Sequence, residues 1–120
     1  MKQLNRQKGT SGEERAEEFL RKNGYKIIDK NNFTKFGEID LIVAKDDILV
    51  FVEVKLKSTE DFGTPEEMID LKKLTQIKRM AEMYLLNHPE IARKFTRYQI
   101  DAVCIVEETG RLTHYENIGF

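Results

Sequence analysis

The sequence predicts an α/β domain in which helices cover a central mixed sheet. The chain has 120 residues and a mass of 14.1 kDa, which suffices for one hydrophobic core but not for two cores joined by a linker. Segments with helical and strand patterns follow one another in the order α-β-β-β-α-β-β, which fits helices packed on the faces of a sheet. Residues 48–57 are rich in β-branched and aromatic side chains, so this strand should lie centrally and be covered on both faces.

The first helix is predicted to follow a basic arm. Residues 1–11 contain three basic residues and no acid, and they lack an apolar period, so we expect a flexible arm. Ser11 to Glu14 reads S-x-x-E, a capping box, so we expect the helix to begin at Ser11. Asn23-Gly24 should end it. Its buried stripe consists of Ala16, Phe19 and Leu20.

Three strands should follow, at residues 25–28, 38–44 and 48–57. The polar turn Lys45-Asp46-Asp47 indicates that the second and third strands pair as a hairpin.

The second helix is expected to begin at Thr64. Thr64-Pro65-Glu66-Glu67 combines an N-cap, a proline at the first helical position and a second capping box. The helix should end near Asn87, before Pro89, and residues 90–95 fit one or two further turns. A fourth strand is predicted at 98–106 and an edge strand at 112–117.

Composition excludes several classes of protein. The apolar runs are far shorter than the roughly 20 residues of a membrane helix, and no basic-then-apolar leader is visible. The lone cysteine, Cys104, excludes an internal disulfide and a multi-cysteine zinc site and favours a cytoplasmic location. Twenty basic and 21 acidic residues leave a net charge of -1, so composition gives no support for nucleic-acid binding.

Charged residues occur where the pattern predicts burial. Side chains alternate along a strand, so Glu53 and Lys55 project together from the face opposite Val50 and Val52. Asp40 lies among apolar neighbours in the second strand, and the predicted hairpin can bring it beside Glu53. Glu13, three residues before Ala16, should point from the first helix toward the sheet.

Three carboxylates and a lysine can therefore converge. Such hard oxygen ligands suit Mg²⁺ or Mn²⁺, and an adjacent lysine can orient a water and counter developing charge, which is a scheme for phosphodiester hydrolysis. Each element also fits a structural role. Glu53 and Lys55 can form a surface ion pair, Asp40 can pair with a helix lysine such as Lys73, and Glu13 can favour the positive end of its helix.

These residues carry a resemblance. G-E-I-D at 37–40 and F-V-E-V-K at 51–55 resemble the PD-(D/E)xK nuclease signature, and from about Gly12 to Val106 the chain resembles the YraN-like family of small bacterial proteins. Late in the chain, Asp101 matches the aspartate of the family's R-F-D strand, while Gln99 replaces its arginine.

The resemblance implies a restriction-endonuclease-like α/β/α fold, similar to that of archaeal Holliday-junction resolvases. It implies that Asp40 and Glu53 hold Mg²⁺ or Mn²⁺, that Lys55 serves the water and that Glu13 completes the site. The expected substrate is DNA with a branch, flap or end. Two alternative functions remain open: a nucleic-acid-binding module that does not cut, and a protein-interaction domain. Cutting both strands of a symmetric junction would favour a homodimer. The basic residues expected to contact nucleic acid are Lys35, Lys57, Lys73, Lys78 and Arg79.

Other residues fit simpler roles. His88 and His114 are too far apart for a local zinc motif, and His88 is expected to cap a helix or join the core. Cys104 is expected to be a small buried hydrophobe. No P-loop sequence is present. Phe33 and Phe36 fit either the core, the simpler role, or a stacking platform for bases.

Overall fold

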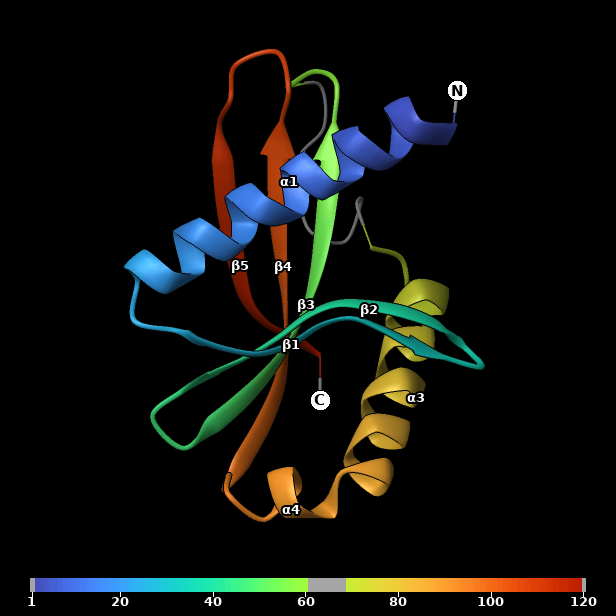
Figure 1. The fold of residues 1–120 in the computed structure, drawn as a ribbon, viewed down its shortest axis with the longest axis vertical. Coiled ribbons are helices and arrows are strands. Elements are labelled where there is room, and N and C mark those ends of the chain that lie inside the picture. The colour runs from blue at the N-terminus through green and yellow to red at the C-terminus, as the bar shows by residue number, and fades with distance from the viewer. Residues whose placement is uncertain (1, 61–68, 120) are drawn as a thin grey trace.

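The computed structural model describes residues 2–60 and 69–119, with side chains from Gly12 onward. Its five strands form one mixed sheet in the order β1-β2-β3-β4-β5, with β3 in the centre (Figure 1). Neighbouring strands are antiparallel except β3 and β4, which are parallel and are joined by a crossover that contains α3 and α4. The predicted α/β class and element order are confirmed, with α4 as a short additional helix.

The bounds of the strands agree best with the sequence pattern in the centre of the sheet. β3 covers Ile48–Lys57 as predicted, and it pairs with β2 through the predicted hairpin. The outer strands are longer than predicted, because β1 pairs with β2 along most of its length and β5 continues along β4. Their bounds are Lys26–Thr34 for β1, Gly37–Lys45 for β2, Arg97–Val106 for β4 and Leu112–Gly119 for β5.

The helices differ from prediction at one N-terminus. Helix α1 spans Lys2–Lys22, so the predicted start at Ser11 is wrong and residues 2–10 belong to the same helix. This segment contains good helix formers and no proline, so the capping box at Ser11 is not needed as a start. Helix α3 spans Leu71–Asn87 and ends where predicted; the expected start at Thr64 lies outside the described residues. Helix α4 spans Pro89–Ala92.

Two apolar layers enclose the sheet, one on each face. Val50 and Val52 of β3 pack with Ala16 and Leu20 of α1, while Phe51 of β3 lies on the opposite face in the layer that includes residues of α3. Figure 1 shows α1 lying obliquely across β3, β4 and β5. The central strand is therefore covered on both faces, as predicted. In the described part of the chain, no helix is long and apolar enough to span a membrane.

Candidate metal and catalytic site

Asp40 occupies the point where β2 separates from β3. The pairing of the two strands stops at Leu41 and Val52, one position short of Asp40 and Glu53. The Asp40 Oδ2 atom accepts a hydrogen bond of 2.8 Å from the backbone N–H of Val54. The carboxylate thus accepts from a backbone N–H of β3 that no longer pairs with the backbone of β2. This hydrogen bond holds the Asp40 side chain in the gap between the two strands.

The alternation of side chains along β2 breaks at Asp40. The sequence pattern predicts Ile39 on the same face as Leu41, but Ile39 packs in the layer that contains α3 while Leu41 packs in the layer that contains α1. Across the hairpin, Asn31 lies between two registered pairs and has a left-handed backbone with φ 52°. Asparagine tolerates this conformation, which interrupts the regular pleat opposite Asp40.

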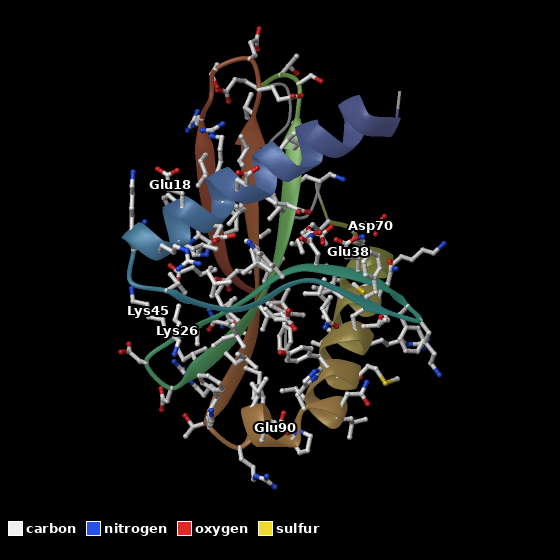
Figure 2. The ribbon with its side chains drawn as sticks, in the orientation of Figure 1. Glu18, Lys26, Glu38, Lys45, Asp70 and Glu90 are labelled. Atoms are coloured by element: carbon white, nitrogen blue, oxygen red, sulfur yellow. The ribbon has the colours of Figure 1, made fainter. Side chains whose placement is uncertain are left out.

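Two further acids join Asp40. Carboxylate oxygens of Glu13, Glu38 and Asp40 all lie within 4.8 Å of one another, and the three side chains are half-buried. Asn31 Nδ2 donates to Oε1 of both Glu13 and Glu38, each at 2.8 Å. Figure 2 shows Glu38 on the β1–β2 hairpin, between α1 and α3. Glu13 reaches the cluster because Gly12 lets α1 pack directly against Leu56. We call these three residues the carboxylate cluster.

Glu38 is the member of this cluster that the sequence prediction missed. Its signal was present in the G-E-I-D segment, where strict alternation puts Glu38 on the same face as Asp40, but Glu38 was not counted among the site residues. The interruption at Asp40 allows neighbouring acids of β2 to meet Glu13 of α1.

Glu53 lies next to the carboxylate cluster and has a basic partner. Its Oε2 atom lies 3.4 Å from the Lys73 ammonium of α3, and the side chains are 12% and 40% exposed. Lys73 is thus in the site, paired with Glu53 rather than with Asp40. Burial, followed by the charges of Glu53, Glu13 and Glu38, raises the pKa of Asp40 to about 8, against the lowering effect of the Val54 hydrogen bond. Among the described residues, the acids here outnumber the nearby cations.

The remaining predicted catalytic residue, Lys55, follows Glu53 on the same face of β3. Its side chain is exposed and forms no ion pair with another described residue. Lys57 lies one further step along this face and is half-buried. Both ammonium groups act on the Cys104 thiol of β4, where burial raises the thiol pKa and the two lysines oppose that change. Lys55 is therefore an exposed cation on the same face of β3 as Glu53.

Two other predicted basic residues meet at the tip of the β1–β2 hairpin. The Lys35 ammonium and the Arg79 guanidinium lie 5.3 Å and 5.8 Å from the centre of the Phe36 ring. Gln76 of α3 donates to the Phe36 carbonyl, so the hairpin is anchored to the helix. Lys78 is exposed on α3. The structure therefore brings Lys73 to the acids and places both Lys35 and Arg79 beside the Phe36 ring. Lys57 lies on β3 beyond Lys55, and Lys78 lies on α3.

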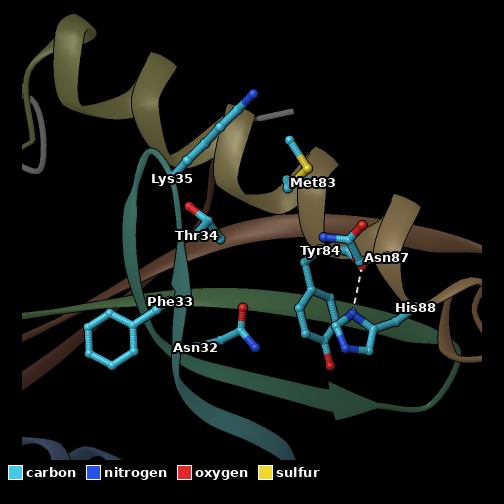
Figure 3. Close-up of a pocket in the computed structure, with 8 residues that line it drawn as sticks. All are labelled: Asn32, Phe33, Thr34, Lys35, Met83, Tyr84, Asn87 and His88. Atoms are coloured by element: carbon cyan, nitrogen blue, oxygen red, sulfur yellow. Dashed lines mark hydrogen bonds between the residues drawn. The ribbon is translucent and has the colours of Figure 1, made fainter.

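A hollow of about 490 Å³ lies between the hairpin and the C-terminal half of α3 (Figure 3). Asn32 and Tyr84 line it, and His88 Nδ1 donates to the Tyr84 carbonyl at 2.9 Å, which confirms His88 as a capping residue. Asn32 pairs with Ile39, on the α3 side of the hairpin, whereas Asn31 faces the carboxylate cluster. The hollow and the cluster thus lie on opposite faces of the hairpin.

A second buried aspartate was not predicted as a structural centre. Asp101 is fully buried and accepts hydrogen bonds from Gln99 Nε2 at 3.0 Å and from the Asn117 N–H at 2.9 Å. Its Oδ2 atom lies 2.7 Å from His114 Nε2. These partners tie β5 to β4 at the point where their register shifts. Cys104 is buried, as predicted.

The sequence also matches known proteins. Residues 12–105 match the family described as "Uncharacterised protein family UPF0102". The chain belongs to the UPF0102 family. A UPF0102 protein of Syntrophomonas wolfei is 44% identical over 108 residues, which are 90% of this chain and 91% of that protein. A UPF0102 protein of Alkaliphilus oremlandii is 37% identical over 115 residues, covering 95% and 98% of the two chains. Glu13, Asp40, Glu53 and Lys55 all fall within the segment that matches UPF0102.

Proposed function

We propose that this UPF0102 protein is a divalent-metal-dependent endonuclease that hydrolyses phosphodiester bonds in structured or branched DNA. The observation that carries the proposal is the convergence of Glu13, Glu38, Asp40 and Glu53 where β2 and β3 separate, with Lys55 and Lys73 beside them. The PD-(D/E)xK resemblance of the same residues supports it.

The donor set suits a hard divalent cation. Carboxylate oxygens are the ligands that Mg²⁺ and Mn²⁺ prefer, and those of Asp40, Glu13 and Glu38 lie within 4.8 Å of one another. Burial, and after it the charges of the neighbouring acids, raises the pKa of Asp40, and a bound cation would offset the repulsion among those acids. Asp40 and Glu53 would hold the ion, with Glu13 and Glu38 completing the set. When bound, the ion supplies positive charge that acidifies a water and stabilises the phosphoryl transition state.

The lysines have separate tasks in this scheme. Lys55 orients the attacking water and offsets charge on the phosphate, because its exposed side chain projects from the same face of β3 as Glu53. Lys73 compensates the charge of Glu53 and holds that carboxylate in place. Lys35, Lys78 and Arg79 form an outer basic surface for the phosphate backbone, and Lys57 extends the row from Lys55.

The experiment compares wild type with Asp40→Asn, Glu53→Gln and Lys55→Ala in a cleavage assay. The substrates are duplex, flap and four-way-junction DNA with Mg²⁺ or Mn²⁺. We expect wild type to cleave a branched substrate and each variant to lose about 10³-fold in rate. Asp46→Asn is the matched control, because Asp46 lies in the distant β2–β3 turn and asparagine tolerates its φ of 55°. Unchanged cleavage by pure, folded Asp40→Asn would refute the assignment.

Calorimetric titration of Mn²⁺ separates metal binding from the choice of substrate. Heat from wild type and Asp46→Asn, but not from Asp40→Asn, would place an ion at the carboxylate cluster. Absence of heat together with DNA binding that is equal in EDTA and Mg²⁺, and no cleavage of any substrate, would identify the alternative, a nucleic-acid-binding module without catalysis. Absence of any salt-dependent DNA affinity would instead favour a protein-interaction domain.

A further inference from the structure

Phe33 presents an aromatic ring to solvent beside the carboxylate cluster. Its side chain is 78% exposed, so the core role expected for it from the sequence is wrong. Phe36, three residues later, packs against the core layer that contains α3. A single exposed apolar side chain has no significance by its exposure alone. For Phe33, the significance comes from the position of the ring relative to the carboxylate cluster.

The register of the β1–β2 hairpin fixes that position. Phe33 pairs directly with Glu38, and paired residues of antiparallel strands project from the same face with Cβ atoms about 4.5–5.5 Å apart. Glu38 belongs to the carboxylate cluster. Figure 3 shows the Phe33 ring directed away from Tyr84 and His88, which lie on the α3 side of the hairpin. Phe33 thus also borders the hollow, but its ring projects from the face of the hairpin that carries Glu38, at the edge of the carboxylate cluster.

A flat ring in this place suits a nucleobase. A base flanking a phosphate held at the cluster lies within reach of a side chain one residue pair away, and every base offers a π-face to an aromatic ring. Lys35, two residues further along the hairpin, is available to the adjacent phosphate. Inside a duplex both faces of a base are already stacked, so an unpaired base offers a face that an internal base pair does not.

We propose that Phe33 stacks on an unpaired base next to the cleaved phosphate and thereby gives the site its preference for flaps, single-stranded branches and open junctions. The inference rests on the proposed nuclease function and specifies its substrate. Phe33 is a specificity residue in this scheme, because it contacts the base while the acids and Lys55 act at the phosphate.

The experiment measures binding of flap DNA with 2-aminopurine at the unpaired position beside the branch, and of matched duplex DNA, in EDTA and in Ca²⁺. We expect wild type to quench 2-aminopurine fluorescence, and Phe33→Ala to lose both the quenching and about ten-fold in flap affinity while duplex affinity stays unchanged. Phe33→Tyr should restore both. Leu86→Ala is the matched control, since Leu86 is 76% exposed on α3.

Cleavage rates distinguish failure of this inference from failure of the proposed function. If wild type cleaves branched DNA and Phe33→Ala keeps the same ratio of flap to duplex cleavage, the inference is wrong and the nuclease stands. If wild type cleaves nothing but the Phe33-dependent quenching persists, the stacking contact stands and catalysis is wrong. If wild type binds no nucleic acid in either buffer, both are wrong.

Discussion

Asp40 and Asp101 are both aspartates enclosed by the sheet, yet their surroundings differ. Asp101 has a donor at every side: Gln99, His114 and the backbone of Asn117. Within residues 2–60 and 69–119, Asp40 has one such donor, the N–H of Val54, and the charged groups that act on it are the acids Glu53, Glu13 and Glu38. One carboxylate is paired within the protein, and the other is placed among groups that repel it.

This is the difference expected between an acid with a structural role and an acid that binds a ligand. A buried charge with a full set of donors stabilises the elements that supply them, here β4 and β5. A group of acids held together raises the free energy of the folded chain unless a ligand of opposite charge joins it. This loss of folding stability is expected at a binding site, where polar groups are left to interact with a ligand instead of with other groups of the protein.

The largest effect is expected when Asp101 is removed. Asp101→Ala leaves the His114 ring and the Asn117 N–H without their acceptor in the core, so we expect the free energy of unfolding to fall by about 3 kcal/mol. Urea denaturation followed by circular dichroism measures it. Glu82→Ala, an exposed acid of α3, is the control and should change stability little. A loss for Asp101→Ala as small as that of the control would contradict the structural role.

The sequence predicted the central acids better than their neighbours. Alternation along residues 48–57 placed Glu53 and Lys55 on one face because β3 is flanked on both sides and keeps a regular pleat. The same rule correctly groups Glu38 with Asp40 but fails for Ile39, which it places beside Leu41, because the left-handed backbone of Asn31 on another strand interrupts the pleat of β2. The Asp101 network depends on a register shift between β4 and β5, which no local pattern encodes. Periodicity thus predicts which face each side chain of a regular strand occupies. It fails where a neighbouring strand changes the pleat or the register.

The second-largest effect is that of Asp40→Asn, which should raise the free energy of unfolding rather than lower it. Asp40→Asn keeps an acceptor for the Val54 N–H but removes the charge, so in metal-free buffer the variant should be more stable than wild type. The unfolded carboxyl titrates near pH 3.8 and the folded one near 8, so between these values the folded wild type holds a proton that the unfolded chain releases. Wild-type stability should therefore fall relative to Asp40→Asn as pH rises from about 4 to 8.

Thermal unfolding of both proteins across this range tests the prediction. We expect no difference at pH 3.5 and an advantage of about 2 kcal/mol for Asp40→Asn at pH 8.5. Added Mn²⁺ should reduce that advantage, because an ion that binds only the folded wild type stabilises it. A pH-independent difference between the two proteins would mean that Asp40 is not held among uncompensated acids.

The smallest effect concerns Lys73, and it tests whether the acids act as one group. Lys73→Ala removes the cation beside Glu53 and should cost about 1 kcal/mol at pH 8.5, more than Lys72→Ala, whose side chain is exposed on the same helix turn. Without Lys73, Glu53 repels Asp40 more strongly, so Asp40→Asn should stabilise the Lys73→Ala protein more than it stabilises wild type. A double-mutant cycle measures this coupling. Strictly additive effects would show that Lys73 pairs with Glu53 without influencing Asp40, and the cluster would then divide into two independent parts.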